Sequence, residues 1–114
     1  MNLAELHLHL DGSLRRETLR ELARPGDDVD VAFHAGMGLQ AALDCFRTTL
    51  SVLQTAVSVR RVADELCVDA SSDGVTTLEI RFAPQLHRGA PIVAIVDAAL
   101  EGILGMAGLF LCGL

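Results

Sequence analysis

The chain has 114 residues, a formal net charge of −6 and a mean hydropathy of +0.41, which suits one small domain or part of a larger one. Its nine basic residues are all arginines and form no run, which argues against a nucleic-acid surface. No apolar stretch approaches the roughly 20 residues that a membrane span needs, and the N-terminus lacks the pattern of a signal peptide. The cysteines Cys45, Cys67 and Cys112 are odd in number and far apart, so we expect free thiols and a cytoplasmic location.

The segment from Glu5 to Gly12 alternates polar and apolar residues, which predicts a β-strand that ends in an Asp-Gly turn. Successive side chains of a strand point to opposite faces, so His7 and His9 share one face. The other face carries the leucines Leu6, Leu8 and Leu10. Imidazole is a common ligand of zinc, so we interpret the histidine face as the edge of a metal site, with Asp11 one step further along it. A pair of hydrogen-bonded histidines is the simpler alternative.

The next segment is helical and then irregular. Apolar residues at helical spacing predict a helix that begins at Ser13 or Arg15. Residues 29–38 show no clear periodicity, so we expect a loop there. Within this loop Phe33 and His34 could approach the mouth of a pocket, although a surface loop with incidental side chains is the simpler interpretation.

Two helices and a second strand follow. Helical spacing covers residues 39–49 and a longer stretch, 52–71. Residues 75–83 have the alternation of a strand, with apolar side chains on one face and Glu79 and Arg81 on the other. Because a buried charge must find a partner, we expect these two side chains to pair inside the fold.

The last third of the chain contains a loop, a helix and a strand. The loop of residues 85–89 follows the second strand, and its histidine, His87, is expected to be solvated. A helix from Pro91 to about Gly105 and a buried apolar strand over residues 108–112 come next. The order β, helices, β, α, β predicts an α/β fold with a parallel sheet and right-handed crossovers.

Several blocks of the sequence resemble the adenosine deaminase family, which belongs to the metal-dependent amidohydrolases and has a (β/α)8 barrel. The most specific blocks are Leu6 to Leu14 and Leu78 to His87. Further matching blocks occur in the same order, at residues 46–49, 52–55, 73–75, 96–102 and 108–112. A complete barrel takes roughly 250 residues. The resemblance therefore implies a partial (β/α)8 TIM barrel of about the first three parallel strands with their helices, residues 1–114 being the N-terminal fragment of a single metal-dependent hydrolase barrel domain.

The resemblance implies that His7 and His9 bind Zn2+, and that His9 and Asp11 contact a purine nucleoside substrate, Asp11 on its ribose side. The family's reaction is the hydrolytic deamination of adenosine to inosine and ammonia, in which a metal-activated water attacks the amine-bearing ring carbon. The family's remaining metal ligand and its catalytic residues come from later strands, and neither His34 nor His87 stands in a matching context. We therefore expect no catalytic residue within this chain and no activity from this fragment alone.

Two alternatives stay open. A related deaminase could act on adenine or another aminopurine derivative, because the pocket residues that separate these substrates lie mainly after Leu114. A hypothesis of another class is a non-catalytic remnant that serves as an interaction module. Its support is the apolar face that a partial barrel leaves exposed, through which the chain could associate with itself or a partner.

Overall fold

The computed structural model describes residues 2–103 and 107–111. Strands, helices and two 3-10 turns (η) follow one another along this part of the chain. They are β1 (Leu3–His9), η1 (Leu10–Gly12), α1 (Arg16–Leu22), α2 (Leu39–Val52), α3 (Ala56–Ser72), β2 (Val75–Phe82), η2 (Pro84–Leu86), α4 (Ile92–Gly102) and β3 (Ala107–Leu111). None of the described helices is both long and apolar enough to cross a bilayer.

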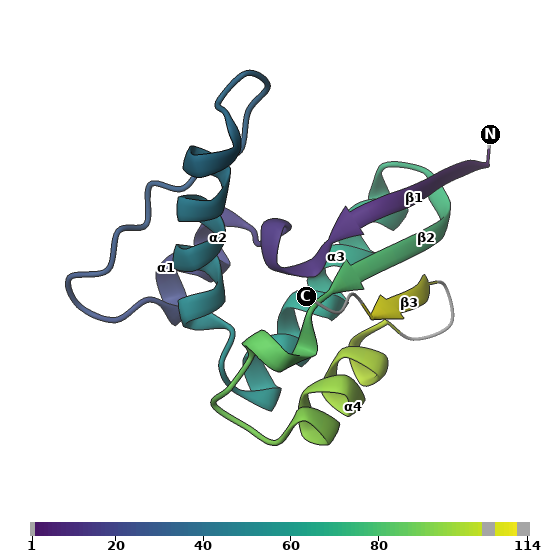
Figure 1. Ribbon diagram of the computed structural model, residues 1–114. Coiled ribbons are helices and arrows are strands. Elements are labelled where there is room, and N and C mark those ends of the chain that lie inside the picture. The colour runs from purple at the N-terminus through teal and green to yellow at the C-terminus, as the bar shows by residue number, and fades with distance from the viewer. Residues whose placement is uncertain (1, 104–106, 112–114) are drawn as a thin grey trace.

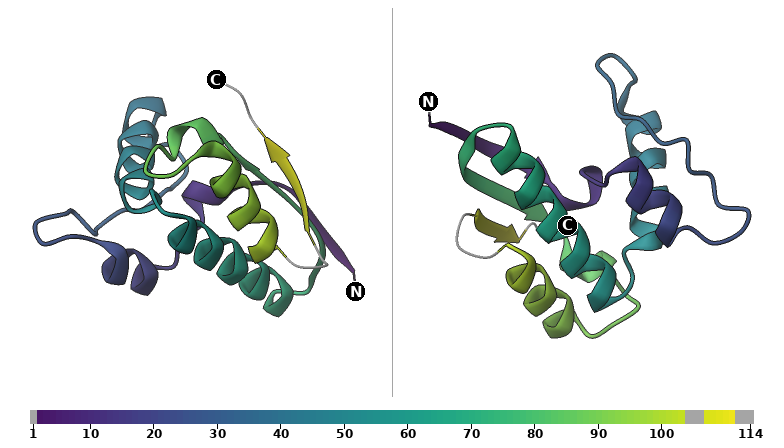
Figure 2. Two further views of the ribbon diagram at one scale, coloured as in Figure 1. Left: turned by 90° about the horizontal axis from the view of Figure 1, so that it is seen from below. Right: turned by 180° about the vertical axis from the view of Figure 1, so that it is seen from behind.

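The three strands form one parallel sheet in the order β1-β2-β3 (Figure 1). Helices α3 and α4 lie side by side and cover the same face of this sheet (Figure 2). Helices α1 and α2 lie beyond the carboxyl ends of the strands, next to η1 (Figure 1). The predicted α/β fold with parallel strands is confirmed.

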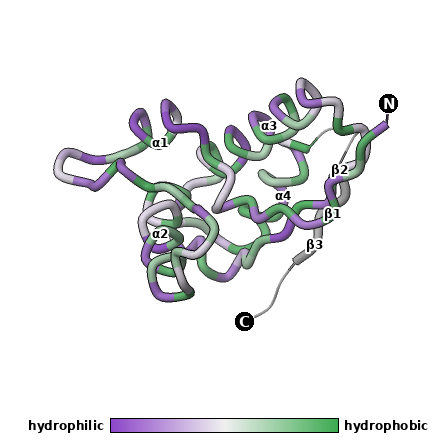
Figure 3. The backbone as a smooth tube through the Cα atoms, turned by 90° about the horizontal axis from the view of Figure 1, so that it is seen from above, coloured by the Kyte–Doolittle hydropathy of each residue, from purple (hydrophilic) through white to green (hydrophobic). Residues whose placement is uncertain are grey.

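The hydrophobic core lies between the sheet and the helices α3 and α4. The β2 residues Leu78, Ile80 and Phe82 are at most 1% exposed, so the predicted apolar face of this strand is the core face. Hydrophilic and hydrophobic segments alternate along α3 (Figure 3), as expected for a helix with one buried side. Glu79 and Arg81 alternate with the core residues of β2 and are only half-buried; that they pair with each other stays a prediction.

The first strand departs from simple alternation. Leu10 is fully buried and Leu8 is half-buried, but Leu6 is 52% exposed, so the three leucines are not equally covered. The cause is a register shift in the pairing of β1 with β2 between Glu5 and Leu8. A bulge of this kind breaks the two-residue period of a strand.

Several helix boundaries also differ from expectation. The helix predicted over 52–71 begins only at Ala56, because α2 continues to Val52. Thr55 caps α3: its Oγ1 accepts from the backbone N–H of Ser58 at 3.1 Å, and the Ser58 hydroxyl accepts from the backbone N–H of Thr55 at 3.3 Å. The first helix begins at Arg16. The end predicted for the last helix at Gly105 and the strand residue Cys112 lie outside the described residues.

Candidate active site

The candidate site begins with two imidazole rings at the carboxyl end of β1. The ring centroids of His7 and His9 are 5.1 Å apart and meet edge to face at 72°. Both side chains are exposed. The pairing of His9 with Arg81 and of Leu8 with Ile80 places His9 on the face of the sheet opposite the core. The two rings therefore stand together on the face that the helices α3 and α4 do not cover.

The turn that follows β1 buries an acidic side chain. Asp11 lies in η1 and is 7% exposed. Burial raises the pKa of the Asp11 carboxyl above its ordinary value, and the residue's own backbone N–H together with His87 and His9 offsets part of this rise. The turn is held locally because the Ser13 hydroxyl donates to the His9 carbonyl oxygen at 2.6 Å.

An open cleft of about 480 Å³ lies beside these residues. Its walls come from the β1 end, from α2 and from the segment after β2, and are formed by His9, Asp11, Leu43, Phe46, Arg47, Leu50, Phe82, Ala83 and Leu86. The Phe46 ring is 5.9 Å from the His9 ring and 4.7 Å from the Phe33 ring, centroid to centroid. The loop before α2 thus reaches the cleft through Phe33. The neighbouring His34 is exposed, and its ring nitrogen Nδ1 lies 3.1 Å from the Ala35 carbonyl oxygen within its own loop.

His87 is buried, and the expectation that it is a solvated loop side chain is wrong. It is 1% exposed, and its Nδ1 donates to the Leu53 carbonyl oxygen at 2.6 Å. Burial lowers the pKa of His87 below its ordinary value, while the bond to Leu53 and the negative charge of Asp11 offset part of the decrease. A long-range contact between the α2–α3 connection and the loop after η2 therefore removes this histidine from solvent.

A second contact joins the same two segments. The Gln54 side-chain amide donates to the Leu86 carbonyl oxygen at 3.2 Å, and the backbone N–H of Gly89 donates to Gln54 Oε1 at 3.1 Å. Leu86 and Leu50 both line the cleft, from the segment after β2 and from α2 respectively. The connection between α2 and α3 therefore fixes how far the α2 wall stands from the wall after β2.

The segment that follows Asp11 is held on α3 by charged groups. The Arg15 guanidinium donates to both carboxyl oxygens of Asp69, at 2.9 and 2.7 Å. This bidentate contact holds the pKa of the Asp69 carboxyl below its ordinary value. The buried Thr18 hydroxyl donates to Glu65 at 2.5 Å. Together these bonds anchor the start of α1, and with it the turn that carries Asp11.

The donor set fits part of a metal site. Two imidazoles standing together suit zinc, but a catalytic zinc centre usually has three protein ligands. Within residues 2–103 and 107–111, no three His, Cys, Asp or Glu side chains are grouped so that they could hold a metal ion. Among the described residues, His7 and His9 therefore offer two of the three protein ligands that such a centre usually has.

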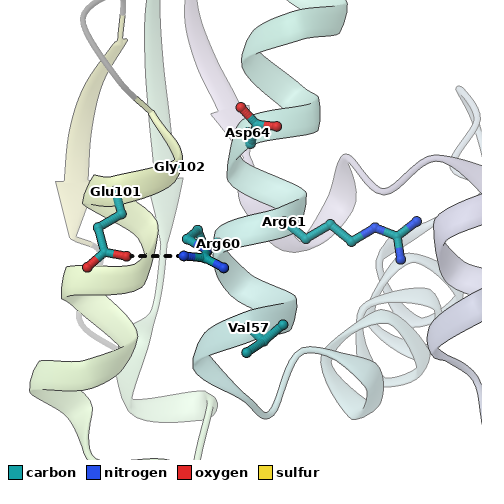
Figure 4. Close-up of a pocket in the computed structure, with 6 residues that line it drawn as sticks. All are labelled: Val57, Arg60, Arg61, Asp64, Glu101 and Gly102. Carbon is teal, nitrogen blue, oxygen red and sulfur yellow. Dashed lines mark ion pairs between the residues drawn. The ribbon is translucent and has the colours of Figure 1, made fainter.

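A second hollow, of about 520 Å³, lies between α3 and α4 (Figure 4). It carries an exposed ion pair in which Arg60 Nη1 lies 3.8 Å from Glu101 Oε2, while Arg61 points away toward Glu21. No histidine or cysteine lines it. The groups suited to metal binding or proton transfer gather instead at the carboxyl ends of the strands, where barrel enzymes place their sites.

Comparison with known proteins identifies relatives that match most of the chain. A family model described as adenosine deaminase matches residues 2–107. The chain is 44% identical over 115 residues to adenosine deaminase from Mycobacterium sp. (strain KMS), which covers 87% of this chain and 32% of the relative. It is 42% identical over 114 residues to a probable adenosine deaminase from Dictyostelium discoideum, with 88% of this chain and 15% of the relative covered. The chain thus spans about a third or less of the length of these two relatives.

Solved structures of deaminases and amidohydrolases have the same fold as this chain over part of their length. An adenine deaminase from Arthrobacter aurescens superposes with a TM-score of 0.76 at 25% identity and covers 96% of this chain and 38% of that one. An amidohydrolase from Burkholderia ambifaria, solved with zinc bound, has a TM-score of 0.76 at 22% identity and covers 99% and 35%. The predicted partial (β/α)8 barrel is therefore confirmed. Because the family match covers residues 2–107 of 114, the chain belongs to the adenosine deaminase family.

Proposed function

We propose that this chain is the N-terminal part of a zinc-dependent adenosine deaminase, which hydrolyses adenosine to inosine and ammonia. The observation that carries the proposal is the pair of imidazoles at the end of β1, 5.1 Å apart and next to a cleft that also contains Asp11. Family membership and relatives that are 42% and 44% identical and named adenosine deaminases support it. The free thiols of Cys45 and Cys67 agree with a cytoplasmic location.

Several side chains in and beside the cleft have roles that follow from their chemistry. The ring nitrogens of His7 and His9 would hold the zinc ion, which when bound lowers the pKa of water toward ~7 and so provides a nucleophile at neutral pH. The Asp11 carboxyl accepts a hydrogen bond from the ribose side of the nucleoside. The apolar side chains of Phe46 and Leu50 on α2 line the cleft and give the purine ring an apolar surface to pack against.

We further propose that residues 1–114 do not turn over adenosine on their own. The described residues offer two metal ligands at this site, and hydrolysis also needs a third ligand and a group that protonates the purine ring. The remaining strands of a barrel would supply both. The role of this chain in the complete site is then to bind the metal and to orient the sugar.

A second candidate substrate is adenine. The Arthrobacter aurescens structure, which is 25% identical to this chain, is an adenine deaminase. The Asp11 carboxyl lines the cleft beside His9 and can accept a hydrogen bond from a ribose hydroxyl, which supports the nucleoside as the first candidate. Turnover of adenosine, adenine and adenosine monophosphate by a full-length version of the protein separates these substrates, and a preference for adenine would overturn the nucleoside assignment.

The test is a chimera in which this chain replaces the matching segment of the mycobacterial adenosine deaminase. We expect the chimera to bind about one zinc per chain and to deaminate adenosine. His7→Ala and His9→Ala should each lower zinc affinity and kcat/KM by at least ~100-fold. Removing a group that only hydrogen-bonds to a metal ligand already costs up to about 100-fold, and removing the ligand itself should cost more.

His34→Ala is the matched control, because His34 is exposed and bonds within its own loop. It should leave zinc content and rate unchanged. A folded chimera that binds no zinc, or whose rate survives His7→Ala and His9→Ala, would contradict the proposal and favour a non-catalytic interaction module.

A further inference from the structure

The connection between α2 and α3 lies beside the loop that follows η2 (Figure 1), and the Gln54 side chain joins the two segments. Its Nε2 donates to the Leu86 carbonyl oxygen at 3.2 Å and to the Leu50 carbonyl oxygen at 2.8 Å. Its Oε1 accepts from the backbone N–H of Gly89 at 3.1 Å. A carbonyl oxygen only accepts and a backbone N–H only donates, so these three partners fix the orientation of the amide.

The two carbonyl groups that share this nitrogen belong to residues of the cleft. Leu50 lines the cleft from α2 and Leu86 lines it from η2, whereas Gln54 lies behind both of them and is not one of the lining residues. Nε2 carries two hydrogens and can give one to each carbonyl. A single amide nitrogen therefore joins the backbone of one wall to the backbone of the other.

The loop reaches Gln54 because residue 89 is a glycine. A Cβ atom on Gly89 would collide with the Gln54 carbonyl oxygen and lie 2.9 Å from its carbonyl carbon. Both of these atoms are backbone, so no side-chain rotation relieves the contact. The bond from the Gly89 N–H to Gln54 Oε1 therefore depends on the missing side chain as well as on the amide.

A second bond holds the same two segments together when the amide is changed. His87 Nδ1 donates to the Leu53 carbonyl oxygen at 2.6 Å, and the two residues are 1% and 0% exposed. Gln54 itself is only half-buried, so its replacement leaves the core intact. Variants of Gln54 are therefore expected to fold and to differ from wild type mainly in how the two walls are held.

We propose that Gln54 is a positioning residue of the cleft. Its amide holds Leu50 and Leu86 at a fixed separation and so determines the width of the space between α2 and η2 that receives the purine ring. That the cleft receives a purine nucleoside rests on the proposed function. The bonding of the amide to both walls rests on the contacts of Gln54 and is tested in the 114-residue chain, without any activity.

The first test uses nuclear magnetic resonance of the 114-residue chain. In wild type the Gln54 side-chain amide hydrogens should exchange more slowly than those of Gln40, which is exposed and bonds within α2. At pH 7 the carboxylate of Gln54→Glu keeps an acceptor for Gly89 but has no hydrogen to give. The carbonyl 13C resonances of Leu50 and Leu86 should therefore move upfield, while the Gly89 amide stays protected from exchange.

Two further variants complete this test. Gln40→Glu is the matched control, because it makes the same substitution on the exposed side of α2 and should move neither carbonyl resonance. Gly89→Ala displaces the loop and leaves the amide on its own segment, so it should move the Leu86 resonance but not that of Leu50. Wild-type Gln54 amide hydrogens that exchange as fast as those of Gln40, or carbonyl resonances that ignore Gln54→Glu, would show that the amide does not join the walls.

The second test measures adenosine deamination by the chimera with the mycobacterial deaminase. Gln54→Glu should raise KM by about 10-fold, the low end of the cost of a changed contact in an apolar pocket. It should leave kcat within about 3-fold, because the histidine pair is untouched. A loss of folded protein would instead lower kcat and leave KM as it was. Gln40→Glu should change neither constant.

The two tests separate this inference from the proposed function. An unchanged KM, in a variant whose carbonyl resonances have moved, would show that the width of the cleft does not depend on Gln54. If the chimera does not deaminate adenosine, the proposed function fails, while the carbonyl resonances of Leu50 and Leu86 still decide whether Gln54 joins the two walls.

Discussion

At the scale of single residues, Gly102 determines how closely α3 and α4 approach. A Cβ atom at this position would lie 2.6 Å from the Ala63 Cβ and 2.6 Å from the Arg60 carbonyl oxygen. Both distances are well inside van der Waals contact, and one of the atoms is backbone. Gly102 and Arg60 border the same hollow in Figure 4. A larger residue would have to push the two helices apart.

Gly102→Ala is therefore expected to destabilise the chain, although alanine is the better helix former. Overpacking of this kind costs about 1–3 kcal/mol of the free energy of unfolding. Urea unfolding followed by circular dichroism measures it. Glu101→Ala is the control in the same helix, because its ion pair with Arg60 is exposed and worth at most about 1 kcal/mol. Equal stability of wild type and Gly102→Ala would show that the helices can separate without cost.

Single residues also show where sequence reasoning succeeds and where it stops. The alternation of β1 places His7 and His9 on one face, because the period of a strand is a local property. The burial of His87 depends on the Leu53 carbonyl, 34 residues away in sequence. No local pattern contains that contact. The strand pattern and the resemblance to the family predict Asp11 at the site. That its Oδ1 is buried without a hydrogen-bond partner among the described residues follows only from the three-dimensional structure.

At the scale of elements, the break between α2 and α3 positions the cleft. Leu53 and Gln54 lie in this break and contact the segment after β2. The apolar spacing of Val52 and Leu53 continues that of the neighbouring helices and hides the break from a periodicity argument. The capping pair of Thr55 and Ser58 is the local signal that marks the true start of α3.

Thr55→Ala should lower the free energy of unfolding by about 1 kcal/mol, because the backbone N–H of Ser58 loses its acceptor at the first turn of α3. Ser51→Ala is the control: Ser51 is exposed near the end of α2, and its hydroxyl bonds only within that helix. It should change stability by a few tenths of a kcal/mol at most. Chemical denaturation measures the free energy of unfolding of both variants. Similar values for Thr55→Ala and Ser51→Ala would mean that tertiary contacts, and not the cap, determine where α3 begins.

At the scale of the whole molecule, the described sheet has β1 at one edge, paired with β2 on one side. Leu6 on this strand is 52% exposed, and an edge strand with exposed apolar side chains favours pairing with a second copy. We predict self-association of the 114-residue chain that weakens with Leu6→Lys. Val93→Lys on the outer side of α4, where Val93 is 67% exposed, should leave it unchanged. Sedimentation velocity over a range of concentrations measures this, and a concentration-independent monomer would contradict it.

The whole architecture was easier to predict than its details. The order of strands and helices, with strand-length apolar runs separated by long helical stretches, leaves few topologies besides a parallel α/β sheet. The resemblance of the block from Leu78 to His87 to the adenosine deaminase family then reduces the possible folds to part of a (β/α)8 barrel. Side-chain contacts between distant loops follow from the assembled fold, and for that reason the cleft walls could not be listed beforehand.

On α3, Asp69 accepts from Arg15 and Glu65 accepts from Thr18, so this helix holds the segment that follows the turn after β1. These bonds to α3 do not involve the loop that carries Phe33, which contacts α2 through Phe46. The turn after β1 can therefore keep its conformation when that loop changes. The loop that carries Phe33 can therefore vary in sequence and length without displacing the histidine pair at the end of β1.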